Sequence, residues 1–450
     1  MRQPGAPALL ALTLALTLGV PAPARASWLE PDPTWRQALQ DLREAQRDTV
    51  GHADDPARLD SVAVLQLRLA RVDEAAKLFR RVLALAPDDP AARAGLGKLA
   101  LFADRAAEAE SLLAPIANDN DQARADLFAL RLRRGEYGLA AAMAESVGQP
   151  GREPLLRELA EGGAYLGGEI GGEVSVPLVK VWPVPLVRVR LNGQSVLLAI
   201  DTGVADLLLD NTTLRRCGLR AIAGESAISW SGSRVAVRSA LVPRLDIGGA
   251  HLERVPASLR DLHRYGMEMN PQFEPVLGVI GVNVLRRFTP TLDFDAQRLI
   301  LRRAGTAYPA PNAQRVPFEL WGESEITVRG SIASGRRMPM WLTLGLPAAG
   351  VGAPAEVFEE FGIKPGVGAG LAKGGTWLRD AGWLGVTVST LSVGPLVRDR
   401  VPGWSGAMES AELWRHFVRR DALLSAAFFR GRRLTIDWQN RQLIVETSGR

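Results

Sequence analysis

This chain has few of the residues that bind metals or form disulfides. Its 450 residues include one cysteine, Cys217, and four histidines, at positions 52, 251, 263 and 416. A single cysteine excludes an intramolecular disulfide, and the histidines have neither the spacing of zinc ligands nor that of an HExxH motif. We therefore expect no metal site and no cofactor. Cys217 is expected to be a small buried apolar residue.

The chain also has no long block of one charge and no long apolar run in its main part. Lys and Arg total 54 against 49 Asp and Glu, which gives a net charge of +5, and the two signs alternate along the sequence. Without a basic block interleaved with aromatic residues, nucleic-acid binding has little support. Beyond residue 26, no segment has the ~18 consecutive apolar residues of a membrane-spanning helix, so no membrane anchor is expected.

Residues 1–26 have the pattern of a signal peptide. Met1-Arg2 supplies a positive start, an apolar run extends from Leu9 to Val20, and Ala24-Arg25-Ala26 provides small residues for cleavage. The apolar run is too short to span a bilayer. We expect cleavage near Ala26 and an exported mature chain, periplasmic or secreted.

Residues 34–148 are rich in Ala, Leu and Arg and show helical spacing of their apolar residues. Units starting at Pro56, Pro90 and Asp121 carry small and apolar residues at matching positions, in a pattern similar to the tetratricopeptide repeat, whose period is ~34 residues. A bundle of ordinary helical hairpins is the alternative. Either would bind a protein partner or another segment of this chain, and neither carries chemistry.

A change in composition separates the helical region from the remainder of the chain. Residues 149–172 contain two glycine pairs, Gly162-Gly163 and Gly167-Gly168, and are predicted to be a Gly-rich linker. From residue 173 onward, Val, Leu and Thr alternate with polar residues, and turn signals recur. This pattern predicts β-strands. The expected fold class is therefore multidomain, with a helical repeat followed by an all-β region.

One stretch of the β region carries a group suited to acid–base chemistry. The apolar segment 196–200 predicts a strand buried on both faces, and it ends in Asp201, followed at once by Thr202 and Gly203. Desolvation raises the pKa of a carboxyl group, and a second carboxylate nearby raises it further. Asp201 is therefore the candidate catalytic residue.

The segment from Pro185 to Arg302 resembles the retropepsin-like aspartic peptidases. It has a leading strand, PLVRVRLNG, then the Asp-Thr-Gly loop, and ~80 residues later the element GVIGVNVLRRFTPTLDF at 278–294. The resemblance implies a β-barrel lobe over 173–303 that binds a protein or peptide substrate. It also implies that Asp201 is the catalytic carboxylate and that Thr202 and Gly203 hold it by hydrogen bonds.

The same resemblance suggests residues that contact substrate. A predicted hairpin around residue 230 corresponds to the flap that closes over substrate in the family, and a plain surface hairpin is the alternative. The element at 278–281 would form a hydrophobic floor, shaped by its glycine. The substrate-binding candidates are Trp230, Ser231, Gly232, Val279, Ile280 and Gly281.

Residues 313–450 contain a second copy of the β unit. The segment from Thr435 matches the segment from Thr291 at an offset of 144, and aligning Gly345 with Gly203 gives 142. In that register Thr343 stands where the first copy has its aspartate. Aspartic peptidases use two carboxylates that share a proton, and threonine cannot act as a base near neutral pH. The second lobe is therefore expected to be degenerate.

The missing carboxylate leaves three hypotheses open. In the first, the chain is an exported aspartic endopeptidase, and the second acid comes from another chain in a homodimer or from Glu323, Glu325 or Asp380. In the second, the lobes are catalytically impaired and bind extended peptides. In the third, the protein is a scaffold that acts through its helical repeats. The intact Asp-Thr-Gly favours the first hypothesis, and the degenerate copy favours the second.

Overall fold

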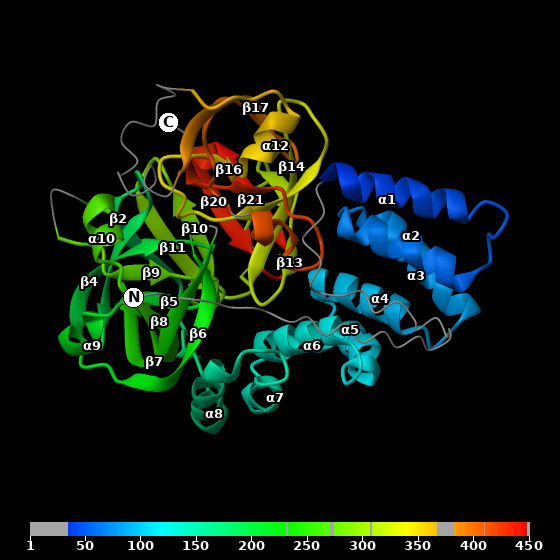
Figure 1. The fold of residues 1–450 in the computed structure, drawn as a ribbon. Coiled ribbons are helices and arrows are strands. Elements are labelled where there is room, and N and C mark those ends of the chain that lie inside the picture. The colour runs from blue at the N-terminus through cyan, green and yellow to red at the C-terminus, as the bar shows by residue number, and fades with distance from the viewer. Residues whose placement is uncertain are drawn as a thin grey trace, which may run out of the picture.

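The computed structural model describes residues 35–230, 233–270, 274–306, 308–366, 382–408 and 410–447. The expected signal peptide and the candidates Ser231, Gly232 and Asp380 lie outside these ranges. In the described part, a helical module is followed by two β lobes (Figure 1). The predicted order, α followed by all-β, is confirmed.

Pairs of helices joined by short turns build the N-terminal module. Asp55, Asp89 and Asn120 begin three of the helices by accepting hydrogen bonds from backbone amides of the first turn. These helices open the three repeat units expected from the sequence. The helices are α1 (Trp35–Asp48), α2 (Pro56–Arg68), α3 (Val72–Leu85), α4 (Pro90–Phe102), α5 (Ala106–Leu113), α6 (Asp121–Arg133) and α7 (Tyr137–Met143).

The prediction of a linker over 149–172 was wrong. This segment contains a 3-10 turn, η2 (Pro150–Arg152), a helix, α8 (Glu153–Gly162), and a short strand, β1 (Leu166–Gly167). The glycine pairs concealed an amphipathic helix, whose leucines pack in two directions. Leu156 packs with Phe128 of the helical module, whereas Leu155 and Leu159 pack with Ile222 of the first lobe. The helix therefore joins the module to the first lobe.

The first lobe consists mainly of antiparallel strands, with three short helices at its edges. Its strands are β2 (Glu173–Lys180), β3 (Leu186–Leu191), β4 (Gln194–Ile200), β5 (Leu207–Asp210), β6 (Ala221–Trp230), β7 (Ser233–Ile247), β8 (Ala250–Arg260), β9 (Gly278–Ile280), β10 (Phe288–Asp293) and β11 (Arg298–Arg303). Its helices are α9 (Thr213–Arg216), α10 (His263–Met269) and α11 (Val282–Leu285).

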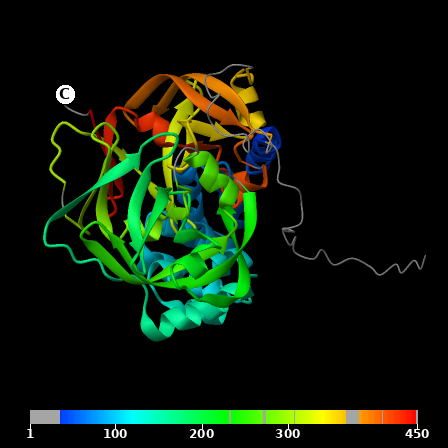
Figure 2. The same cartoon turned by 90° about the vertical axis from the view of Figure 1, so that its left-hand side faces the viewer.

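The second lobe lies beside the first (Figure 2). Its strands follow the same kind of order as those of the first lobe. Its strands are β12 (Gln314–Pro317), β13 (Glu319–Trp321), β14 (Glu325–Ile332), β15 (Met338–Leu342), β16 (Val351–Ala353), β17 (Leu384–Val393), β18 (Leu396–Ser405), β19 (Ala422–Leu424), β20 (Arg432–Asp437) and β21 (Gln442–Thr447). The helical turns are α12 (Ala355–Glu360), η3 (Ser410–Trp414) and η4 (Ala426–Phe429).

A shared sheet joins the two lobes and makes their internal symmetry visible. The part of this sheet that crosses between the lobes has the strand order β12-β21-β20-β10-β11-β2, and it continues from β2 into the first lobe. Within these six strands, the three of the second lobe mirror the three of the first. At the centre, β10 pairs with its own copy β20. There the Thr291 and Thr435 hydroxyls, which lie 144 residues apart, form a hydrogen bond of 2.6 Å. The structure therefore agrees with the duplication inferred from the sequence.

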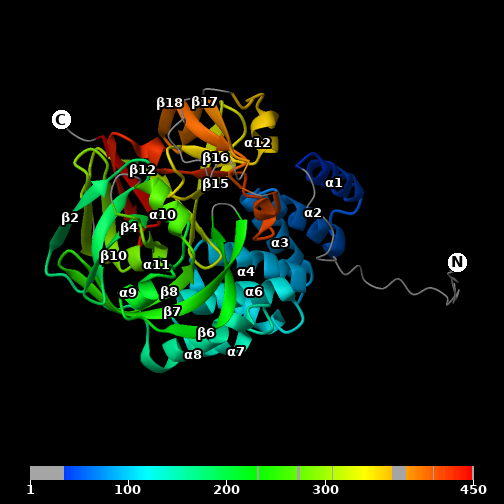
Figure 3. The ribbon, with the colours of Figure 1, turned by 60° about the vertical axis from the view of Figure 1, so that its left-hand side comes forward.

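The helical module rests against both lobes (Figure 3). On the second lobe, Trp321 is fully buried and stacks on Phe102 of α4, with ring centroids 4.6 Å apart. Arg133 of α6 donates to the carbonyl oxygens of Leu320 and Gly322 at 2.6 Å. One surface of the repeats thus binds another segment of the same chain.

Among the helices of the described ranges, none is long and apolar enough to cross a membrane.

Candidate active site

Two equivalent loops meet between the lobes. In the first lobe, β4 runs parallel to β9 and ends just before Asp201, whose amide donates to the Ile280 carbonyl at 3.1 Å. In the second lobe, β15 runs parallel to β19 and ends just before Thr343, whose amide donates to the Leu424 carbonyl at 2.9 Å. Buried apolar strands therefore hold both loop starts in the same way.

The two loops are joined by hydrogen bonds. Oδ1 of Asp201 accepts from the Gly203 amide at 2.8 Å and from the Thr343 hydroxyl at 2.7 Å. The backbone amides of Leu344 and Gly345 also favour the ionised form of this carboxyl group. In the other direction, the hydroxyl of Thr202 donates to the Leu342 carbonyl at 2.7 Å. The register expected from the sequence, with Asp201 opposite Thr343, is therefore present in the structure.

Burial raises the pKa of Asp201. Its side chain is only 6% exposed, and this desolvation raises its pKa above the ordinary value for an aspartate. The hydrogen bonds from Gly203, Thr343, Gly345 and Leu344 oppose the rise because they favour the ionised form. No positively charged side chain is among the main influences on this carboxyl group.

Glycines allow the loops to approach this closely. A Cβ atom at Gly345 would lie 2.3 Å from Oδ2 of Asp201, and one at Gly203 would lie 2.5 Å from Oγ1 of Thr343. Beneath the first loop, a Cβ at Gly281 would lie 2.1 Å from the Asp206 carbonyl oxygen. Any larger residue at these three positions would force the loops apart.

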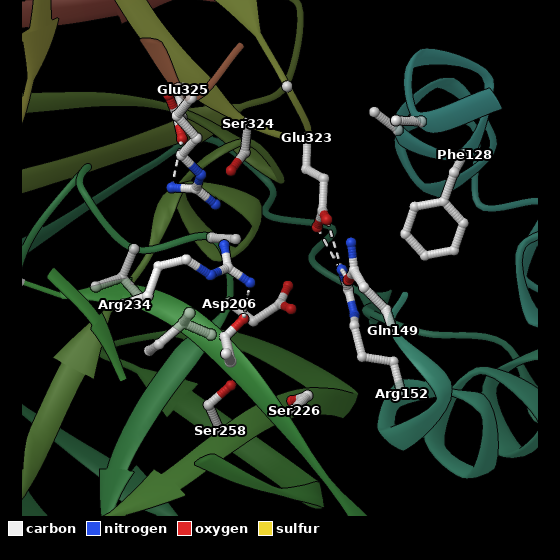
Figure 4. A pocket seen from close by; sticks show the side chains of 18 of the residues that line it. Phe128, Gln149, Arg152, Asp206, Ser226, Arg234, Ser258, Glu323, Ser324 and Glu325 are labelled. Atoms are coloured by element: carbon white, nitrogen blue, oxygen red, sulfur yellow. Dashed lines mark hydrogen bonds and ion pairs between the residues drawn. The ribbon is translucent and has the colours of Figure 1, made fainter. Parts of the chain in front are cut away.

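A cavity of about 300 Å³ opens beside the first loop. Its walls include the loop itself with Thr202 and Gly203, the β6–β7 hairpin, the helical module and the second lobe, which contributes Glu323, Ser324 and Glu325 (Figure 4). The hairpin contributes Ser226, Ala227, Ile228 and Arg234. The helical module contributes Phe128 among others, and the segment expected to be a linker contributes Gln149 and Arg152.

Comparisons with known families agree with this geometry. Residues 187–284 match the family model described as aspartyl protease, and residues 66–133 match the model described as tetratricopeptide repeat. The chain joins an aspartyl-protease-like domain to tetratricopeptide repeats. No curated protein matches the chain.

Two solved structures are similar to parts of the chain. Basic 7S globulin from soybean is 12% identical, with a TM-score of 0.38, and the match covers 62% of this chain and 95% of that one. A retropepsin-like aspartic protease from Rickettsia conorii is 16% identical, with a TM-score of 0.20, and the match covers 29% of this chain and 89% of that one.

The protease-like site contains one aspartate where the catalytic pair would need two. Glu323 is held by Arg152, with nitrogen–oxygen distances of 2.5 and 3.0 Å. Glu325 bonds to Arg420, to Arg415 at 3.1 Å and to His416 at 2.9 Å, and its pKa is lowered because the charge of Arg420, with smaller effects of His416 and Arg415, outweighs its burial. Each glutamate is therefore engaged with cations, and neither bonds to Asp201.

The homodimer alternative also disagrees with this arrangement. In a symmetric dimer, a second Asp201 would take the position opposite the first. That position is occupied by Thr343 of the same chain, which bonds directly to the carboxyl group. The sheet shared by β10 and β20 holds the second lobe there.

The predicted substrate-binding residues have two different positions. Val279, Ile280 and Gly281 are buried under the loop and do not line this cavity. Their role is to position the loop that carries Asp201. Trp230 lies at the end of β6 and packs against the Tyr265 ring, with centroids 5.2 Å apart. It is half-buried and also lies outside the cavity lining.

Metal binding finds no support among the described residues. No group of three or more His, Cys, Asp or Glu side chains lies close enough together to hold an ion.

Proposed function

We propose that the two lobes bind extended peptides in the space between them without cleaving the peptide bond. The observation that carries this proposal is the Thr343 hydroxyl, which stands where the second acid would be and donates to the same Asp201 oxygen that accepts from the Gly203 amide. An aspartic peptidase needs a free lone pair to take a proton from water and a second acid to polarise the carbonyl group.

The mode of binding follows from the free edge of β6. Among the described strands, β6 is the last of its sheet and pairs only with β7. Its residues Ser226, Ala227 and Ile228 line the cavity beside the loop. An unpaired strand edge next to a cavity supports binding by strand addition, in which backbone hydrogen bonds give affinity and side-chain pockets give specificity.

Aspartic endopeptidase activity is the second candidate. It is favoured by Asp201 itself, which is buried, has a raised pKa and lies in an intact Asp-Thr-Gly loop. A small opening of the lobes that separates Asp201 from Thr343 would release one lone pair. Water activated by Asp201 alone would then attack the peptide without a second acid, which predicts slow hydrolysis at best.

An assay of cleavage and binding on the same samples separates the two candidates. Wild type, Asp201→Asn and Thr343→Val are incubated with a mixed peptide library at pH 4.5 and pH 7.5. Cleavage is then followed by mass spectrometry and binding by retention on the immobilised protein. We expect retention without cleavage. Cleavage by wild type that Asp201→Asn abolishes would instead establish the endopeptidase.

Export is proposed separately and rests on the signal-like pattern of residues 1–26. The expected product is a mature chain starting near Ser27 in the periplasm or medium. N-terminal mass spectrometry of the protein from fractionated cells measures this, and an intact Met1 in the cytoplasmic fraction would contradict it.

A further inference from the structure

The cavity beside the first loop is closed on one side by the 3-10 turn η2. A Cβ atom at Gly151 would lie 1.5 Å from the Glu225 carbonyl oxygen, so the turn and β6 are in direct backbone contact. The next residue, Arg152, holds Glu323 of the second lobe at 2.5 and 3.0 Å. The turn therefore runs from the edge strand of one lobe to the other lobe.

This closure limits how far a peptide can extend along β6. Its edge faces the cavity at Ser226, Ala227 and Ile228, and η2 contacts the backbone at the neighbouring positions Gly224 and Glu225. A peptide added to this edge would meet η2 and could not continue. It would have to end inside the cavity, so the groups around that end decide which terminus fits.

Arg234 is the cavity-lining cation without an acidic partner among the described residues. Arg152 pairs with Glu323, and Arg415 and His416 pair with Glu325. The Arg234 guanidinium makes one long hydrogen bond, 3.4 Å, to the Ala227 carbonyl oxygen. Figure 4 shows this side chain entering the cavity from the β6–β7 hairpin.

The carboxyl group of Asp206, which also lines the cavity, is better satisfied. Its Oδ1 accepts from the Tyr165 hydroxyl and, at 2.8 Å, from the Asn283 amide. A guanidinium with one weak contact gains more from a new ionic partner than a carboxyl group that already accepts two hydrogen bonds. The closed end therefore favours a negatively charged group over a positively charged one.

We propose that this cavity is a subsite for the C-terminal carboxylate of a bound peptide, with Arg234 as its charged partner. The proposal rests on the peptide-binding function above and adds the part of the peptide that is recognised. Peptides that end in a free carboxylate bind along β6 and stop at η2. Internal segments of longer chains are excluded because η2 blocks their continuation.

The test uses the full-length mature protein and two matched peptide mixtures. Both are N-acetylated heptapeptide libraries, one with free C-terminal carboxylates and the other with C-terminal amides. Retention on immobilised protein selects sequences, whose affinities are measured by fluorescence anisotropy as acid and amide. Peptides are checked for cleavage by mass spectrometry. We expect the acids to bind about tenfold to a hundredfold more tightly, as charge-assisted hydrogen bonds allow.

Variants assign that preference to one side chain. Arg234→Gln should remove the difference between acid and amide without weakening amide binding, and Arg234→Lys should retain part of it. Arg238→Gln is the matched control, because Arg238 is exposed on the same strand, donates to Asn211 at 3.0 Å and does not line the cavity. It should leave the preference unchanged.

Each other outcome overturns the proposal in a different way. Equal binding of acids and amides contradicts terminus recognition but leaves the peptide-binding function in place. A preference that survives Arg234→Gln contradicts the assignment of the site. Tighter binding of the amides than of the acids would mean that the closed end disfavours a negatively charged terminus. No retention of either library contradicts both this proposal and the proposed function.

Discussion

Removing the Thr343 hydroxyl tests the hydrogen bond that replaces the second catalytic acid. The Thr343 hydroxyl and Oδ1 of Asp201 are 2.7 Å apart, and the two residues are 7% and 6% exposed. Thr343→Val keeps the shape of the side chain and removes only the donor. A hydrogen bond to a charged group contributes about 1.5–3 kcal/mol, so we expect a loss of about 2 kcal/mol in the free energy of unfolding at pH 7.5.

The sign of the pH dependence follows from the raised pKa of Asp201. An acid whose folded pKa is raised stabilises the fold below its unfolded pKa, and this stability is lost as the pH rises through the folded value. The Thr343 hydroxyl opposes the rise because it favours the ionised form. Its removal raises the pKa of Asp201 further, so the cost of Thr343→Val should fall to about 1 kcal/mol at pH 4, where a neutral hydrogen bond is lost.

A lobe-specific assay is available because the chain has one cysteine. Cys217 lies in the first lobe and is 2% exposed, so its reaction with a thiol reagent along a urea series reports the opening of that lobe. A double-mutant cycle with Asp201→Asn should give a coupling of about 1 kcal/mol or more. Coupling near zero at both pH values would refute the view that Thr343 holds the carboxyl group.

Three further changes test other parts of the fold. Burial raises the pKa of Asp60 to about 7, so above that pH the folded protein has to hold a buried, ionised carboxylate. Asp60→Asn should therefore raise the free energy of unfolding by about 2 kcal/mol at pH 8 and change it little at pH 4. Urea unfolding at both pH values measures this. Trp321→Ala removes a fully buried ring stacked on Phe102, at a cost of about 3–5 kcal/mol, and should make the helical module more sensitive to limited proteolysis than the lobes. Unchanged digestion would contradict this. Gly281→Ala places a methyl group 2.1 Å from the Asp206 carbonyl oxygen and should destabilise the first lobe by roughly 3 kcal/mol or more in the Cys217 assay. Labelling of Cys217 at the wild-type rate would instead show that the loop moves away from the methyl group.

The duplication could be predicted because matching residues occur at the same structural positions in both copies. The closing strands share a Thr-x-Asp pattern, and the loops share a glycine that is required wherever the two loops touch. Because these residues are needed at the same positions in both copies, the spacing between the copies is still readable in the sequence. In the structure it is 142 residues between Asp201 and Thr343 and 144 residues between Thr291 and Thr435. The single-aspartate site followed directly from that register.

The walls of the cavity could not be predicted because they depend on docking between distant segments. Arg152 and Glu323 are 171 residues apart, and no local pattern links them. The segment around Arg152 was expected to be a linker, because its glycine pairs were given more weight than the leucines of α8. Arg234 had a weak signal, since it lies on the predicted flap hairpin, but its direction depends on the tertiary fold.

The asymmetry between Asp201 and Thr343 depends on both loops belonging to one polypeptide. In a symmetric dimer, one codon specifies both loops, so a change from aspartate to threonine would remove both acids at once. Here the sheet shared by β10 and β20 lies within a single chain, and each loop has its own codon. Mutation can therefore convert one loop into a hydrogen-bond donor while the other loop keeps its aspartate. A symmetric dimer cannot lose one of its two acids in this way.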